Sequence, residues 1–80
     1  MSEYWEGLQE DIKETKAAIE DLNKHIEKIY HLQQTTPQEH VEKHEELQQI
    51  EYKLEDQLAF YELKLQDLTR EECMYEYFCS

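Results

Sequence analysis

Apolar residues recur every three or four positions through the first half of the chain. This seam consists of Trp5, Leu8, Ile12, Thr15, Ile19, Leu22, Ile26, Ile29 and Gln33. With Trp5 at position a of a heptad, Ile12, Ile19 and Ile26 fill the next three a positions, and up to Ile29 only Thr15 interrupts the apolar series. The spacing predicts a long amphipathic helix over residues 3–33.

The second half of the chain repeats the same spacing. Its seam consists of His40, His44, Leu47, Glu51, Leu54, Leu58, Tyr61, Leu65, Leu68, Glu72, Tyr75 and Cys79. The apolar character is strongest from Leu47 to Leu68. The pattern predicts a second helix over residues 37–78.

The only proline separates the two patterns. Thr36, Pro37 and Glu39 match a capping box, in which Thr36 is the N-cap and Pro37 is the first residue of the second helix. A turn at residues 34–36 makes the helices antiparallel. We therefore expect an all-α, two-helix coiled-coil hairpin, with residues 1–80 as a single domain.

This turn also predicts which residues face each other across the hairpin. Facing residue numbers should sum to about 70, which pairs Trp5 with Leu65 and Ile19 with Glu51. Residues after Leu68 then have no first-helix partner, although this tail is the most aromatic part of the chain.

A second apolar stripe, with Tyr52, Ala59, Phe60 and Leu63, is predicted opposite the second-helix seam. The apolar candidates for dimerisation or partner binding are Tyr52, Phe60, Leu63, Met74, Tyr75, Tyr77 and Phe78. A helix that is apolar on two sides expects two neighbours, so we expect two hairpins to dimerise into a four-helix arrangement. The alternative is that the same patch docks a different protein.

The formal net charge of -12 argues against binding to nucleic acid or to an anionic membrane and favours a protein partner with a basic surface. No apolar run is long enough to span a bilayer, and the N-terminus lacks the features of a signal peptide. We therefore expect a cytoplasmic protein, in the host cytoplasm if it is viral. Cys73 and Cys79 are expected to be free thiols, and a disulfide between subunits is the alternative.

The longer and more acidic second helix supplies the candidate charged surface. The candidate residues of this acidic face are Glu55, Asp56, Glu62, Asp67, Glu71, Glu72 and Glu76. In size and charge the chain is similar to small acidic phage proteins that block bacterial nucleases or polymerases. This resemblance implies an inhibitor that occupies the basic nucleic-acid-binding surface of another protein, as a mimic of nucleic acid. The alternative is a coiled-coil adaptor that docks partners through its apolar stripe and aromatic tail.

No catalytic or phosphate-binding motif is present, and one glycine cannot form a phosphate-binding loop, so we expect neither an enzyme nor a cofactor. His40 and His44 are spaced to share one helix face, and the predicted register places His25 level with His44. These three histidines are a weak candidate for a metal site. Hydrogen bonding at the hairpin end and a response to pH are the alternatives.

Overall fold

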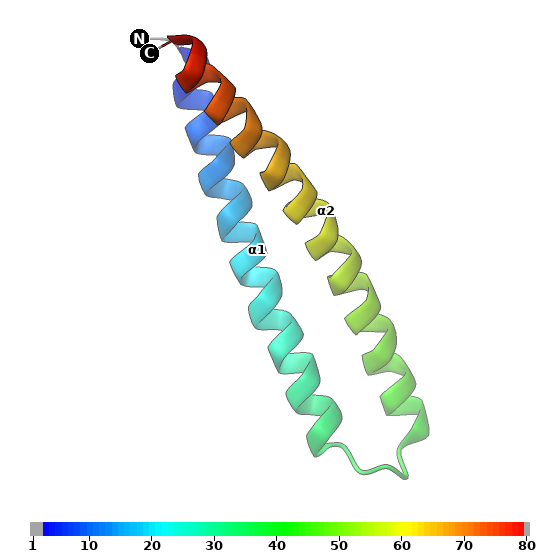
Figure 1. Cartoon of the computed structure of the whole chain (residues 1–80). Coiled ribbons are helices and arrows are strands. Elements are labelled where there is room, and N and C mark those ends of the chain that lie inside the picture. The colour runs from blue at the N-terminus through cyan, green and yellow to red at the C-terminus, as the bar shows by residue number, and fades with distance from the viewer. Residues whose placement is uncertain (1–2, 80) are drawn as a thin grey trace.

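The computed structural model describes residues 3–79 and contains two long helices. Helix α1 spans Glu3–Thr35 and helix α2 spans Val41–Cys79, and residues 36–40 connect them. The helices run antiparallel, so the start of α1 and the end of α2 lie at the same end of a rod that measures 61 × 14 × 14 Å (Figure 1). The predicted all-helical hairpin is confirmed.

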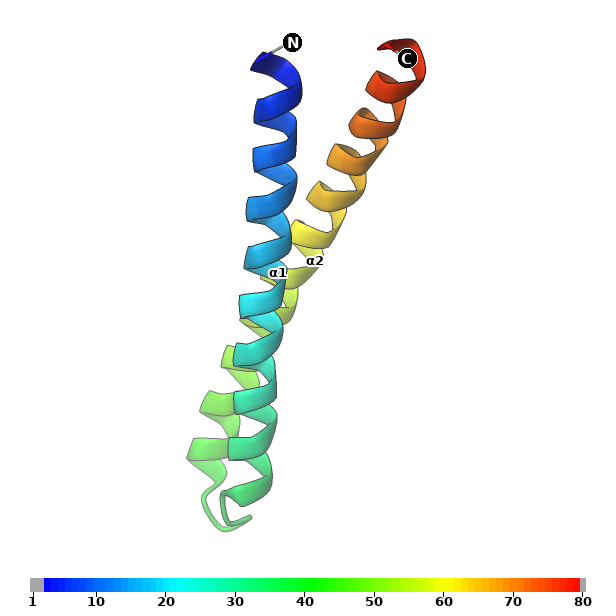
Figure 2. The same cartoon turned by 90° about the vertical axis from the view of Figure 1, so that its left-hand side faces the viewer.

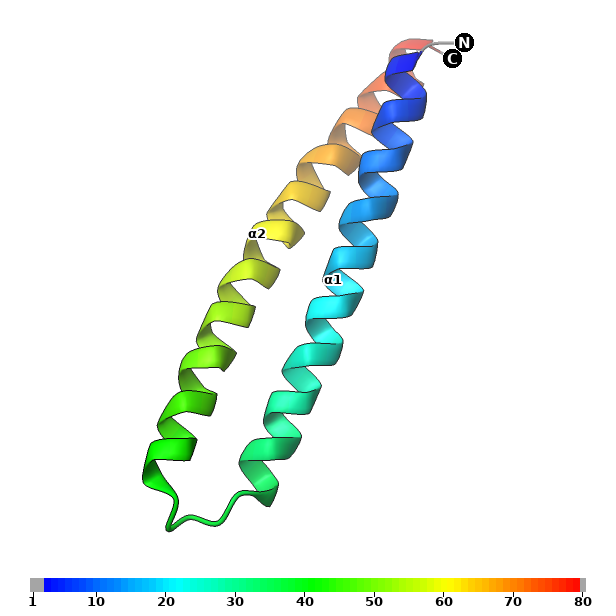
Figure 3. The same ribbon diagram turned by 180° about the vertical axis from the view of Figure 1, so that it is seen from behind.

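The two helices wind around each other. In Figure 1 the ribbons are separated near the connection and overlap near the termini, and Figure 2, a quarter turn away, shows the opposite. Such winding keeps a seam of seven-residue period facing its neighbour, because this period is shorter than two turns of a straight helix. The view from behind shows the same two helices, and residues 3–79 form no third element that could cover either of them (Figure 3).

The side chains of the predicted seams, from Trp5 to Gln33 and from His44 to Tyr75, face each other between the helices, and we call this contact the inner seam. His40, which the pattern predicts in the seam, is exposed and precedes α2, and the side chain of Cys79 lies outside the described residues. The buried members of the inner seam, each at most 8% exposed, are Leu8, Ile12, Thr15, Leu22, Ile26 and Leu47. The remaining inner-seam positions of α1 are half-buried, which confirms the seam predicted for this helix. Thr15 is accommodated because its hydroxyl donates a hydrogen bond to the carbonyl of Asp11 at 2.7 Å.

The pairing of residues across the inner seam differs from the predicted one. Trp5 stacks on Tyr75, the Tyr4 hydroxyl donates to Glu71 at 3.0 Å, and the Tyr30 hydroxyl donates to Glu55 at 3.1 Å. Facing residue numbers therefore sum to about 80. The expected sum of about 70 is wrong because it follows from a turn at residues 34–36, whereas the connection in the structure is centred near residue 38.

The predicted capping box is wrong as well. The backbone N–H of Thr36 donates to the carbonyl of Leu32 at 2.9 Å and its hydroxyl donates to the same oxygen at 2.6 Å, so Thr36 caps the end of α1. The first hydrogen bond of α2 runs from the His44 N–H to the His40 carbonyl at 3.1 Å. His40 is therefore the N-cap, and α2 begins at Val41, four residues later than expected.

Candidate protein-interaction surface

The side of α2 that faces away from α1 carries a second series of residues with alternating spacings of three and four. We call this series the outer seam, and it consists of Phe60, Leu63, Asp67, Arg70, Met74 and Tyr77. Such spacing places all six side chains on one helix face. The inner-seam residues of α2 occupy the opposite face, so α1 cannot cover the outer seam.

The four apolar residues of the outer seam are exposed to solvent. Phe60 and Leu63 are each 63% exposed, Met74 is 53% exposed and Tyr77 is 79% exposed. Tyr52 and Phe78, which the sequence also suggests for this surface, flank the outer seam and are exposed as well. Polar and charged side chains usually occupy a helix face that points to solvent. This set of large exposed apolar side chains is therefore a candidate contact surface.

Tyr75 does not belong to this surface. Its ring lies 5.1 Å from that of Trp5 and 5.6 Å from that of Tyr4, measured between centroids, so it packs within the hairpin. The expectation that the aromatic tail extends beyond the first helix is therefore wrong. The true register brings Tyr75 level with the start of α1, while Tyr77 and Phe78 point outward and contact each other edge to face at 5.3 Å.

The candidate acidic residues do not form one face. Glu55, Glu62 and Glu76 follow one row along α2, Glu72 lies on the half-buried inner seam, and Asp67 lies on the outer seam. Three of the seven carboxylates accept hydrogen bonds within the hairpin, those of Glu55 from Tyr30, Glu71 from Tyr4 and Glu72 from Gln9. The seventh, Asp56, is exposed on the outward side.

Two of these carboxylates affect the tyrosines that they bind. The hydrogen bond to Glu71 raises the pKa of Tyr4, and the hydrogen bond to Glu55 raises the pKa of Tyr30. Each carboxylate accepts a hydrogen bond from the neutral phenol and would repel the phenolate, which favours the protonated tyrosine.

Few of the charged side chains described by the structure form ion pairs. Among residues 3–79 one ion pair is found, between Lys24 and Glu20, which are 3.9 Å apart and exposed on α1. Asp67 and Arg70 therefore form no ion pair with described residues, although they are neighbours in the outer seam. Arg70 is also the only arginine of the chain.

The structure does not bring the three candidate histidines together. His40 is the N-cap of α2, the His44 ring Nε2 lies 3.1 Å from the Pro37 carbonyl, and His25 is exposed on α1 in a register that no longer faces His44. No group of three histidine, cysteine or acidic side chains suited to a metal ion occurs within the described part of the chain.

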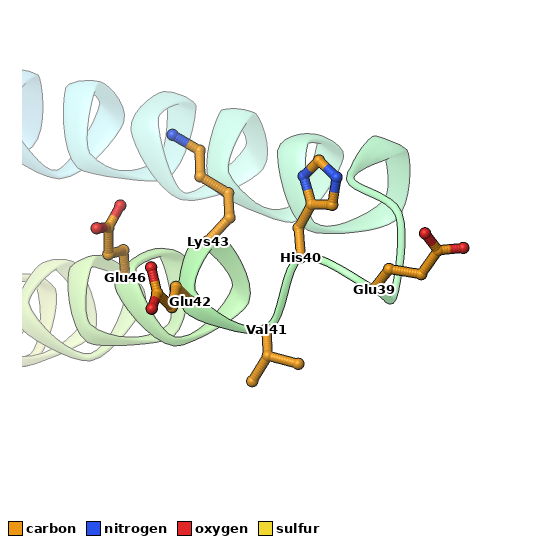
Figure 4. Close-up of a pocket in the computed structure, with 6 residues that line it drawn as sticks. All are labelled: Glu39, His40, Val41, Glu42, Lys43 and Glu46. Carbon is orange, nitrogen blue, oxygen red and sulfur yellow. The ribbon is translucent and has the colours of Figure 1, made fainter.

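A hollow of about 490 Å³ lies beside the first turn of α2 and opens to solvent. Its lining residues are Glu39, His40, Val41, Glu42, Lys43 and Glu46. Figure 4 shows that these side chains fan outward from the start of the helix and do not converge on a common point. We therefore assign no site to this hollow.

The thiol of Cys73 is free and exposed, whereas the side chain of Cys79 lies outside the described residues. Neither described helix has the length and apolar character needed to cross a membrane.

Comparisons with protein-family models, with curated proteins and with solved structures found no match to this chain. Function is therefore inferred from the geometry of the hairpin. Sequence inspection found Phe60, Leu63, Met74 and Tyr77 but missed that Asp67 and Arg70 join them into one seam. The alternating spacing from Phe60 to Tyr77 was the available signal.

Proposed function

We propose that this protein is a non-enzymatic coiled-coil assembly module that dimerises through the outer seam of α2. The observation that supports this proposal is the exposure of Phe60, Leu63, Met74 and Tyr77 on a helix face with coiled-coil spacing. A second copy would supply the missing helix, and the pair would form a four-helix arrangement. The free thiol of Cys73 fits a reducing compartment such as the cytoplasm, where we place the protein.

Energetic considerations favour covering this seam. Burying a side chain of this size contributes roughly 1.5 to 3 kcal/mol. The inner seam provides only a narrow core, because its buried residues among those described number six, and none of them is fully buried. A chain of 80 residues with a small core gains more from association than a larger domain does.

Sedimentation velocity on a seam variant and a matched control tests this function. Phe60→Ser together with Leu63→Ser should convert the dimer to a monomer. Val41→Ser should leave the dimer intact, because Val41 is 59% exposed but lies outside the outer seam. Circular dichroism should show that all three proteins are equally helical. A double variant that dimerises as tightly as the natural chain would contradict the proposal. If the natural chain is a monomer and the outer seam binds a different protein, the module is an adaptor and the proposed dimer is wrong.

A second candidate function is inhibition of a protein with a basic, nucleic-acid-binding surface, as expected of a nucleic-acid mimic. The observation that favours it is the near absence of ion pairs among residues 3–79 of a chain whose net charge is -12. Unneutralised carboxylates attract a basic surface over a distance set by the salt concentration. The exposed row of Glu55, Glu62 and Glu76 on α2 is the surface that we propose for this contact.

This second function predicts a complex that forms at low salt, dissociates at high salt and excludes nucleic acid from the bound protein. Reversing Glu55, Glu62 and Glu76 to lysine should abolish binding. Reversing Glu6, Glu20 and Glu27 of α1 makes the same change in net charge and serves as the control. A complex that resists salt, or that leaves nucleic acid bound, would contradict this function.

A further inference from the structure

The outer seam has the same spacing and the same apolar positions in both directions along α2, and reversing its direction exchanges the acidic residue with the basic one. Its sequence of residue types is apolar, apolar, acidic, basic, apolar and apolar, and its spacings of three and four are symmetric about the peptide between Leu68 and Thr69. We propose that two copies of the chain pair antiparallel through this seam, with a twofold axis at that peptide. This inference rests on the proposed dimer and adds its orientation, its centre and its contacts.

The twofold axis determines which residues meet. Phe60 faces Tyr77 of the second copy, Leu63 faces Met74 of the second copy, and Asp67 faces Arg70 of the second copy. A contact of this kind is isologous, since each residue pair occurs twice. The apolar pairs lie at both ends of the seam, and two ion pairs occupy its centre.

The central charges decide the orientation. In a parallel pair, Asp67 would lie beside Asp67 and Arg70 beside Arg70 of the second copy, which places like charges in contact. In the antiparallel pair each carboxylate meets a guanidinium, and neither group has another ion-pair partner among residues 3–79. Charged residues within a coiled-coil seam typically specify orientation and register at some cost in stability.

The flanking residues favour the same orientation. Lys64 and Glu71 are exposed beside the outer seam, and the antiparallel alignment brings Lys64 of one copy within reach of Glu71 of the other. Glu71 already accepts one hydrogen bond from Tyr4 at 3.0 Å, through one carboxylate oxygen. The other oxygen is available to the lysine. The parallel alignment pairs neither residue with an opposite charge.

The position of the outer seam also determines the shape of the dimer. Inner and outer seams lie on opposite sides of α2, so each α1 lies on the far side of its own α2. The four helices therefore form a flat layer, with the two copies of α2 in the middle, and do not form a square bundle.

A disulfide cross-link beside the seam tests the orientation without changing any seam residue. Gln66 and Cys73 are exposed on the same flank of the seam, and the antiparallel alignment places residue 66 of one copy beside Cys73 of the other. Gln66→Cys in a Cys79→Ser background should therefore form a disulfide-linked dimer in a glutathione redox buffer. Adding Cys73→Ser should reduce the linked fraction at least tenfold.

A second cross-link would detect a parallel dimer, because the parallel alignment places residue 63 beside residue 63 of the second copy. Leu63→Cys in a Cys73→Ser, Cys79→Ser background should therefore stay unlinked. Linkage of this variant, or a dimer in which Gln66→Cys and Cys73 do not link, would overturn the antiparallel orientation and leave the proposed dimer intact. A monomeric natural chain in sedimentation would overturn the proposed function itself.

Discussion

The indole ring of Trp5 stacks on the ring of Tyr75, with centroids 5.1 Å apart and planes inclined by 25°. These residues lie near opposite ends of the sequence, and their contact closes the hairpin at the end away from the connection (Figure 1). The pair aligns the two helices and turns Tyr75 inward. It thereby separates Tyr75 from the apolar residues that remain on the outer seam.

A double-mutant cycle measures this contact. Trp5→Leu and Tyr75→Leu should each lower the free energy of unfolding, and the two changes should couple by about 0.5–1.5 kcal/mol because an aromatic pair is worth this much beyond the area it buries. Denaturant unfolding followed by circular dichroism provides the values. Tyr52→Leu is the control, because Tyr52 is exposed and should not couple to Trp5→Leu. Independent effects of Trp5 and Tyr75 would argue against the observed register.

Reversing charge at the centre of the outer seam should weaken the dimer, and a second reversal should restore it. Asp67→Arg places two like charges together in the antiparallel dimer, and we expect the dissociation constant to rise at least tenfold. Asp67→Arg combined with Arg70→Asp recreates the opposite-charge pair and should return the constant to near its original value. Sedimentation equilibrium measures each constant. Failure of the double reversal to rescue the single one would count against this pairing.

An aspartate at the start of α2 should stabilise the hairpin. His40 is the N-cap of α2, and aspartate is among the best residues at this position because its carboxylate accepts backbone N–H groups and favours the positive end of the helix dipole. His40→Asp should raise the free energy of unfolding by about 1 kcal/mol in thermal or denaturant unfolding. His31→Asp adds the same charge near the C-terminal end of α1 and should destabilise. No gain from His40→Asp would contradict the assigned helix start.

The stability of the hairpin should fall at high pH through Tyr4 and Tyr30. Their pKa values are raised in the folded chain by Glu71 and Glu55, so each tyrosine stabilises the fold below its unfolded pKa of about 10 and loses that contribution as the pH rises through the folded pKa. Tyr4→Phe combined with Tyr30→Phe should reduce the loss of melting temperature above about pH 10.

Tyr52→Phe is the matched control, because the Tyr52 hydroxyl accepts a hydrogen bond from Gln48 at 3.0 Å and binds no carboxylate. Its melting temperature should follow that of the natural chain as the pH rises. Equal alkaline sensitivity in all three proteins would show that the two tyrosine–glutamate bonds do not contribute.

The inner seam could be predicted from sequence because burial follows the spacing of apolar residues in a coiled coil. Even the polar Thr15 is buried at its predicted seam position, because its hydroxyl donates a hydrogen bond to the Asp11 carbonyl of its own helix. The register could not be predicted in the same way. Thr36 can either start a helix through its side chain or end one, and hydrogen bonds to Leu32 decide for the second role. The turn lies a few residues later than predicted, so every facing pair differs from the predicted one and His25 does not lie level with His44.

The outer seam was predictable only in its apolar members. Phe60 and Leu63 are conspicuous on an outward face, but Asp67 and Arg70 resemble ordinary solvated residues when each is considered alone. Their meaning depends on the helix being continuous to Cys79 and on α1 covering the opposite side. The position of the aromatic tail could not be predicted for a related reason, since only the observed register assigns Tyr75 to the inner seam.

The mass of the natural protein in solution tests the central claim most directly. Sedimentation equilibrium over a range of concentrations at neutral pH and moderate salt should give twice the 9.8 kDa of one chain, with dissociation on dilution. A mass of 9.8 kDa at every concentration would contradict the proposal that the outer seam joins two copies.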